Sequence, residues 1–352
     1  MASMLQLLRR DRDATEELFE SAPPVRLSRH VIELGDGHRV GVAIAGRGVP
    51  FVVVHGFGVE SLLYAQPLAR LAALGFRVIA IDIAGHGDTE GIGWLPRLDD
   101  YSVLLTRALD HLGVRRAVLV GHSLGGRLMA DVAAADPDRV IGLVLLDAIV
   151  GAQWERLRCV LRWSPPAAAA YGAAFAIDAL GTLPVVQDTE QALKIGSRVT
   201  RSVELHVARP WRAFTPGQAI LRSRSSLPVL ERIRAAGVYV AVVHGDRDML
   251  VPISAGRDTA RRVDGDFVMV RGGTHSWLLR CPETLPAIVG ELLEGRLGEA
   301  RERVVHDGHD LDDACVDPGA LAVSLGGGLE PVTLDTARRA PRYDWSVEPR
   351  SA

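Results

Sequence analysis

The sequence predicts an α/β protein with a mostly parallel sheet and helices on both faces. Short apolar runs alternate with segments whose apolar residues recur at helical spacing, and this alternation is typical of parallel strands joined by helices. A second observation is a glycine-flanked serine between an apolar run and a helical pattern, at residues 121–125. The third is that an aspartate and a histidine follow later apolar runs, so both belong to loops at the same edge of the sheet as the serine.

The predicted elements follow from apolar periodicity and from turn residues. Residues 1–23 have the pattern of a charged, partly amphipathic helix that ends at a pair of prolines. Residues 25–34 and 38–45 flank a glycine-containing turn and predict a hairpin. The other predicted elements are, in chain order, strand 51–54, helix 62–74, strand 78–81, helix 101–112, strand 117–120, helix 124–135, strand 140–146, helix 230–236, strand 238–243, helix 253–262, strand 267–270 and helix 282–294.

The alternation divides the chain into a core, an insertion and a tail. The core comprises residues 24–148 and 227–295. The insertion, residues 149–226, has no strand-like alternation and predicts a helical cap. Its basic residues outnumber its acidic ones, which hints at an acidic group on a substrate, although surface arginines are usually just solvated. The tail, residues 296–352, is acidic and poor in aromatics, so we expect it to be flexible or loosely docked.

Composition limits the class of function. The 352 residues are 48% hydrophobic, and the formal net charge of −3 gives no support for nucleic-acid binding. Three scattered cysteines argue against a disulfide framework and fit a reducing compartment. No segment reads as a secretory signal or as a membrane span, so we expect a cytoplasmic protein without integral membrane insertion. The oligomeric state stays open.

Ser123 is the candidate nucleophile. The segment Gly121-His122-Ser123-Leu124-Gly125 lies at a predicted strand-to-helix turn, where a strained backbone exposes a serine hydroxyl. Larger side chains two residues on either side would collide at such a turn, which gives both glycines a steric reason. Because a pentapeptide of this kind also arises by chance in a glycine-rich chain, the remaining sequence has to supply a base and an acid.

His275 is the candidate base and Asp248 the candidate acid. A serine hydroxyl needs a base within hydrogen-bond reach, and a carboxylate has to orient that base. Both residues follow predicted strands, so they belong to loops at the carboxyl edge of the sheet. Asp246 and Asp147 are rival acids, because each also follows a strand. The alternative for His275 is an ordinary surface-loop histidine.

Two backbone amides are candidate donors to an oxyanion. The amide of Leu124 follows the serine at the start of a helix, where the dipole favours negative charge. The amide of Phe57 lies in a glycine-containing loop after strand 51–54, and the alternative for that loop is a plain strand-ending turn. We expect the substrate to contact Gly56, His122, Trp154 and Trp277 in a largely apolar pocket, although ordinary packing would explain either tryptophan.

Together these motifs resemble the α/β-hydrolase superfamily, in particular its capped serine-hydrolase branch of esterases and lipases. The resemblance rests on the segments 55–58, 82–89, 121–126, 245–252 and 273–275. It implies an eight-stranded, mostly parallel sheet with an inserted helical cap. Segment 82–89 resembles a tight turn of the family, for which we expect a structural role.

The sequence therefore predicts a serine hydrolase that cleaves a small or medium carboxylic ester, or a thioester, and that requires no metal or organic cofactor. We expect its partner to be a small ester with an apolar acyl group. Perhydrolase, lyase or C–C hydrolase chemistry on the same triad is one alternative, and a non-catalytic binding protein is another. We interpret a polar cluster in the tail as a solvated charge run, although it also has metal-ligand residue types: His306, His309, Asp310, Asp312 and Cys315.

Overall fold

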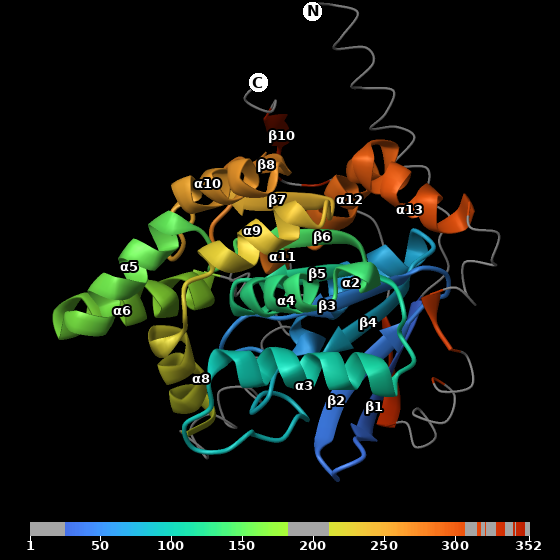
Figure 1. The fold of residues 1–352 in the computed structure, drawn as a ribbon, viewed down its shortest axis with the longest axis horizontal. Helices are drawn as coiled ribbons and strands as arrows, with labels where there is room; N and C mark the ends of the chain where they lie inside the picture. Colours follow the sequence, from blue (N-terminus) through green and yellow to red (C-terminus); the bar gives the residue numbers. More distant parts are fainter. Residues whose placement is uncertain are drawn as a thin grey trace, which may run out of the picture.

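The computed structural model describes residues 25–181, 211–306, 315–317, 321, 329–334, 341 and 343–348. Their centre is one twisted sheet of ten strands in the order β10-β8-β7-β6-β5-β3-β4-β2-β1-β9 (Figure 1). The strands are β1 (Val25–Glu33), β2 (Arg39–Ala45), β3 (Pro50–Val54), β4 (Arg77–Ile81), β5 (Ala117–His122), β6 (Val140–Leu146), β7 (Val240–Gly245), β8 (Asp266–Val270), β9 (Leu329–Leu334) and β10 (Trp345–Glu348).

The interior of the sheet is parallel, as the sequence predicts. Strands β4, β3, β5, β6, β7 and β8 pair in parallel along the sheet. Strands β1 and β2 form the predicted antiparallel hairpin, with Ser28 opposite Ile44 and Glu33 opposite Arg39. The central strands β3 and β5 are buried along their whole length, because helices cover both faces of the sheet.

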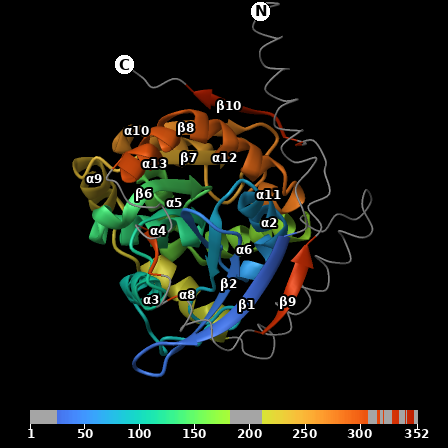
Figure 2. The ribbon, with the colours of Figure 1, turned by 90° about the vertical axis from the view of Figure 1, so that its right-hand side faces the viewer.

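Two groups of core helices cover the two faces (Figure 2). One group comprises α3 (Leu98–His111), α4 (Leu124–Ala135), α9 (Leu227–Ala235) and α10 (Ile253–Val263), which pack in series. The other group comprises α2 (Ala65–Ala73), α11 (Trp277–Arg280) and α12 (Thr284–Glu294). Two short 3-10 helices are η1 (Ser61–Tyr64) and η2 (Pro137–Arg139).

The predicted insertion contains three described helices. They are α5 (Ala152–Trp163), α6 (Pro165–Gly181) and α8 (Trp211–Arg222), and they lie together beyond one edge of the core (Figure 1). We call them the inserted helices. Helix α5 contacts α6, α8 and the core helix α10. Residues 182–210 of the insertion and the predicted helix 1–23 lie outside the described residues.

The sheet has two strands more than the eight expected, and both belong to the segment 296–352. Strand β9 pairs antiparallel with β1, and β10 pairs antiparallel with β8. The same segment begins with helix α13 (Arg296–His306). Edge strands leave unpaired amides and carbonyls that accept a further strand. An ion pair between Arg257 and Glu348 also joins β10 to α10. Among the described residues, no helix combines the length and the apolar character needed to cross a membrane.

Candidate active site

Ser123 occupies a strained turn between β5 and α4. Its backbone angles, φ 53° and ψ −114°, lie in a region that residues other than glycine rarely adopt. Three backbone hydrogen bonds hold this conformation: the Ser123 amide donates to the Leu146 carbonyl at 2.9 Å, and the Ser123 carbonyl accepts from the amides of Ile149 and Arg127. The surrounding backbone therefore fixes the serine at the carboxyl edge of the sheet.

The glycines that flank Ser123 are sterically required. A Cβ atom on Gly121 would lie 2.3 Å from the Gly125 carbonyl oxygen, and a Cβ atom on Gly125 would lie 2.2 Å from the Val54 carbonyl oxygen. Both distances are far below van der Waals contact, and the atoms concerned are backbone atoms that cannot rotate away. The chain can make this tight turn only with glycine at both positions.

Asp248 and His275 form a buried hydrogen-bonded pair. The Nδ1–H of His275 donates to Oδ2 of Asp248 at 2.8 Å, while Oδ1 of Asp248 accepts from the amides of Leu250 and Val251 at 2.7 and 2.9 Å. The two side chains are 5% and 0% exposed. The Asp248 carboxylate thus has a fixed orientation, and it fixes which ring nitrogen of His275 carries a proton.

The electrostatics of this pair favour an imidazolium. Burial alone would lower the pKa of His275, but the charge and hydrogen bond of Asp248, with smaller contributions from Asp147 and Asp178, raise it to about 9. Burial alone would raise the pKa of Asp248, but the His275 charge and hydrogen bond lower it below its ordinary value. Each partner therefore stabilises the charged form of the other.

The rival carboxylates have other contacts. Asp246 is exposed, and its Oδ1 accepts from the Gly272 amide at 2.6 Å. Asp147 is fully buried; its Oδ1 accepts from the Gly245 amide at 2.8 Å and its Oδ2 accepts from the Trp277 indole at 2.6 Å. Burial, together with the nearby charge of Asp248, raises the pKa of Asp147 well above its ordinary value. Of the three acids, Asp248 is the one that binds the His275 ring.

A buried polar relay links the loop of Gly56 to the backbone of His275. The Gly56 amide donates to the Tyr64 hydroxyl at 3.2 Å, and that hydroxyl lies 2.8 Å from Nδ1 of His122. The other ring nitrogen of His122, Nε2, donates to the His275 carbonyl at 2.8 Å, which leaves Nδ1 to accept from Tyr64. The rings of His122 and His275 lie 4.8 Å apart, so His275 packs beside the residue that precedes Ser123.

This relay requires a neutral His122. Burial, reinforced by the charge of His275, lowers the pKa of His122 to about 3. The sequence placed His122 in contact with substrate, and the structure shows that both of its ring nitrogens are bound to the protein. The sequence did not predict the relay, because its members are joined only by tertiary contacts.

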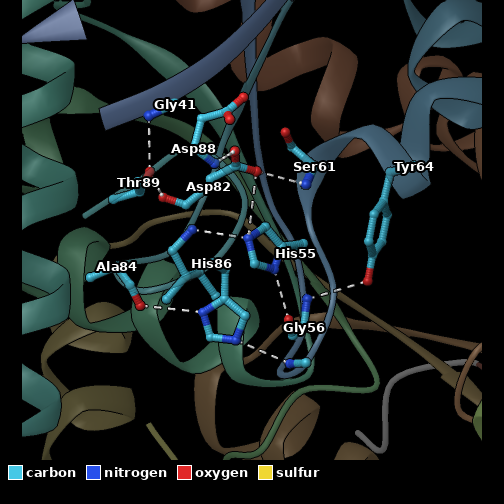
Figure 3. Close-up of polar contacts among 12 residues, drawn as sticks. Gly41, His55, Gly56, Ser61, Tyr64, Asp82, Ala84, His86, Asp88 and Thr89 are labelled. Carbon is cyan, nitrogen blue, oxygen red and sulfur yellow. Dashed lines mark hydrogen bonds and ion pairs between the residues drawn. The ribbon is translucent and has the colours of Figure 1, made fainter. Parts of the chain in front are cut away.

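In the loop after β3, two backbone amides donate hydrogen bonds within the protein and the amide between them does not. The Gly56 amide is bound to Tyr64, and the Gly58 amide donates to Nε2 of His86 at 3.1 Å (Figure 3). The Gly56 carbonyl accepts from Nδ1 of His55 at 2.7 Å. Between them, the Phe57 amide has no acceptor among the described residues, and neither has the Leu124 amide at the first position of α4. The two amides predicted as oxyanion donors are therefore available.

The turn 82–89 supports this loop from below. Nε2 of His55 accepts from the Ile83 amide at 2.9 Å, and Oδ1 of Asp82 accepts from the Ser61 amide at 2.8 Å (Figure 3). The Thr89 hydroxyl donates to the Asp82 carbonyl at 2.8 Å. These contacts join the turn to His55 and to the start of η1, as expected of a turn that packs against the loop after β3.

Aromatic rings from the inserted helices lie near this loop. The Phe175 ring of α6 lies 5.8 Å from the Phe57 ring, and the Tyr171 ring lies 6.3 Å from the Trp154 ring. Trp154 is 2% exposed, and Trp277 is completely buried with its indole N–H on Asp147. Trp277 is therefore part of the core, whereas Tyr171 and Phe175 are partly exposed.

One buried group among the described residues has the residue types and proximity of a metal site. One potential ligand atom each from Asp147, His244 and Asp248 lies within 4.8 Å of the others. All four carboxylate oxygens already accept protein hydrogen bonds, and Nε2 of His244 donates to the Val251 carbonyl at 2.9 Å. We interpret the group as a hydrogen-bonded support for His275. Of the polar tail cluster, residues 307–314 lie outside the described residues.

Comparison with known proteins agrees with the fold. The sequence model of the alpha/beta hydrolase fold family matches residues 49–279. A putative non-heme haloperoxidase of Mycobacterium phage D29 is 34% identical over 260 residues, which is 73% of this chain and 92% of the relative. A non-heme haloperoxidase of Rhodococcus erythropolis is 28% identical over 65% of this chain and 85% of its own length.

Solved structures show the same architecture. A thermophilic esterase of Thermogutta terrifontis superposes with a TM-score of 0.58 at 22% identity, over 76% of this chain and 98% of the esterase. The 2-hydroxy-6-oxo-6-phenylhexa-2,4-dienoate hydrolase of Rhodococcus sp. strain RHA1 superposes with a TM-score of 0.59 at 18% identity, over 77% and 98%. At these identities the likeness concerns the fold. The family model, the similarity to the phage relative over most of its length and the fold all indicate the same family. The chain belongs to the α/β-hydrolase fold family.

Proposed function

We propose that the protein is a serine hydrolase that cleaves a small or medium carboxylic ester, or a thioester, through an acyl-enzyme on Ser123. The observation that carries this proposal is the buried Asp248–His275 pair, whose imidazole packs beside the strained turn that presents Ser123. A serine, an oriented imidazole and a buried carboxylate are the parts that nucleophilic acyl transfer requires.

In the proposed reaction, Nε2 of neutral His275 takes the Ser123 proton as the hydroxyl oxygen attacks the substrate carbonyl. Asp248 keeps the His275 proton on Nδ1 and stabilises the imidazolium as it forms. The imidazolium then gives its proton to the leaving alcohol or thiol. Next, His275 deprotonates a water molecule that attacks the acyl group, and the acid leaves as Ser123 regains its proton.

The free amides of Phe57 and Leu124 support stabilisation of the tetrahedral intermediate. Neither has an acceptor among the described residues, and the Leu124 amide stands at the positive end of helix α4. The bound amides of Gly56 and Gly58 hold the Phe57 peptide in place without consuming its N–H. We place the acyl group between this loop and the partly exposed rings of Tyr171 and Phe175.

Replacement of the nucleophile tests the proposal directly. Ser123→Ala should lower kcat for a short-chain aryl ester at least ~10³-fold, and a fluorophosphonate probe should label the wild-type protein but not the variant. Ser225→Ala, which removes an exposed hydroxyl, is the matched control and should keep both activity and labelling. Near-normal turnover by Ser123→Ala would refute the assignment, and failure of the wild type to label would favour a non-catalytic binding protein.

Perhydrolysis is a second candidate, because two relatives are named non-heme haloperoxidases. Hydrogen peroxide in place of water would attack the same acyl-enzyme, releasing a peracid and restoring Ser123, and the peracid could then oxidise a halide. Assays of one ester with and without peroxide, with monochlorodimedone and bromide as halogenation reporter, separate the two reactions. C–C hydrolase or lyase chemistry would instead show as turnover of a β-diketone or similar substrate without ester cleavage.

A further inference from the structure

Asp178 is the only charged residue of helix α6, whose sequence is otherwise alanine, aromatic and aliphatic residues with proline and glycine. Ionised side chains on such a helix are normally turned to solvent. The Asp178 side chain is instead half-buried, and its Oδ2 accepts a hydrogen bond from the Ser276 hydroxyl at 2.6 Å. Ser276 directly follows His275, so α6 brings a carboxylate next to the proposed active site.

The same face of α6 contacts the proposed oxyanion loop. Tyr171, Phe175 and Asp178 are spaced four and three residues apart, which places them on one side of the helix. Phe175 packs on the Phe57 ring, and its ring lies 3.4 Å from the position of a Cβ atom on Gly58. A single helical face therefore spans from the loop of Phe57 to the residue after His275.

The charge of Asp178 reaches the reacting groups. It contributes to raising the pKa of His275 and, after the effect of burial, to raising the pKa of Tyr64. After burial, the nearby carboxyl groups of Asp147 and Asp178 raise the pKa of Tyr64, and that of Asp248 raises the pKa of Tyr171. Since Asp248 is paired with His275, the carboxylate of Asp178 adds a negative charge that has no ion-pair partner among the described residues.

Three arginines of the inserted helices have contacts away from the proposed site. Arg158 forms an ion pair with Glu155, and Arg162 stacks over the exposed ring of Trp163. Arg222 donates to the Pro96 carbonyl. The basic excess of the insertion, which hinted at an acidic substrate group, is thus not directed at His275 by these three side chains.

We propose that Asp178 is a specificity-determining residue that selects against anionic esters and favours esters carrying an ammonium group near the scissile carbonyl. The inference rests on the proposed ester hydrolysis at Ser123. A fixed negative charge in a partly desolvated site interacts with a substrate charge several ångströms away more strongly than it would in water. Neutral esters should be affected little, because they bring no charge to the site.

Three aryl esters of equal chain length test the charge selection. They are the p-nitrophenyl esters of butanoic acid, of 4-trimethylammoniobutanoic acid and of butanedioic acid, the last as the monoester. For the wild type, kcat/KM should be greater for the cationic ester than for the anionic one. In Asp178→Asn, which retains a hydrogen-bonding group for Ser276, this cation-to-anion ratio should fall about tenfold or more. The ratio cancels any shift in the ionisation of His275, because all three substrates share that base.

Ser276→Ala separates charge from mechanical positioning. This variant removes the hydrogen bond to Asp178 but keeps the carboxylate. Charge selection predicts that the wild-type ratio persists in Ser276→Ala, whereas a purely mechanical role predicts equal losses for all three esters in both variants. The latter result would overturn the inference.

Salt dependence of the wild type provides a test that needs no variant. Added NaCl should move the cation-to-anion ratio toward one, because ions screen the interaction. A ratio that stays constant with salt, or one that is unchanged in Asp178→Asn, would overturn the inference while hydrolysis of the neutral ester left the proposed function intact. If no ester is cleaved and the fluorophosphonate does not label Ser123, the proposed function and this inference both fail.

Discussion

The pH dependence of activity tests the Asp248–His275 pair most directly. Only neutral His275 can accept the Ser123 proton, so a pKa of about 9 predicts that kcat/KM rises with pH until about pH 9. The rise from the ordinary 6.5 corresponds to about 3 kcal/mol in favour of the imidazolium. At pH 7, about 1% of the free enzyme would then hold a neutral base.

Asp248→Asn should change this profile in two ways. The amides of Leu250 and Val251 would keep the new amide oxygen on their side, which turns the NH₂ group toward Nδ1 of His275. The ring proton then moves to Nε2, the wrong tautomer for a base, and the plateau should fall about 10⁴-fold. Without the carboxylate charge, burial dominates, and the pKa of His275 should drop below 6.5.

The assay is kcat/KM for a neutral aryl ester between pH 5 and 10, corrected for spontaneous hydrolysis. Asp246→Asn is the matched control, because it changes a neighbouring, exposed aspartate whose partner is the Gly272 amide. The control should retain both the wild-type plateau of kcat/KM and its rise with pH until about pH 9. The reasoning would be refuted if kcat/KM of Asp248→Asn still rose until about pH 9, or if its plateau stayed within about tenfold of the wild type. It would also be refuted if Asp246→Asn lost the plateau and shifted the rise to lower pH.

Two further substitutions probe the relay and the turn. Tyr64→Phe leaves the buried Gly56 amide without an acceptor and Nδ1 of His122 without a donor. The free energy of unfolding, measured in urea, should therefore fall by about 2–4 kcal/mol. A decrease of less than about 1 kcal/mol would contradict the relay. Gly121→Ala places a Cβ atom 2.3 Å from the Gly125 carbonyl oxygen and should cost about 3 kcal/mol or more. Gly172→Ala, with nothing within 4 Å, is its control and should unfold at the wild-type urea concentration or above.

Local patterns made the core of the fold predictable. The apolar runs before Ser123 and after Pro137 are buried strands because each is short, rich in valine and leucine, and bounded by turn residues. The turn at Ser123 was predictable as well, since its glycines are adjacent in sequence to the clashes that they avoid. Some boundaries moved. Helix α3 begins at Leu98 rather than at residue 101, and the predicted helix 62–74 is the 3-10 helix η1 followed by α2. Strand β7 is Val240–Gly245 rather than 238–243, because Gly237 at φ 69° turns the chain after α9.

Features made by distant segments were not predictable. Strand β9 contains a proline, and the apolar alternation of β10 covers only four residues, too few to distinguish a strand from the surrounding tail. Both strands pair with the open edges of β1 and β8, which supply hydrogen bonds. Tyr64 and Asp178 show no motif at all. Their contacts with His122 and Ser276 depend on how η1 and α6 dock, and no spacing in one sequence encodes that.

The two buried acids near His275 show how one site assigns different states to similar side chains. Asp147 and Asp248 lie within one small cluster, and two carboxylates this close resist simultaneous ionisation. Their surroundings separate them, because Asp248 faces an imidazole whose charge lowers its pKa, whereas burial and the Asp248 charge raise that of Asp147. Asp248 is therefore the anion that can balance a charge forming on His275. Asp147, whose pKa is raised by burial, accepts from the Trp277 indole and the Gly245 amide and makes no hydrogen bond to the His275 ring.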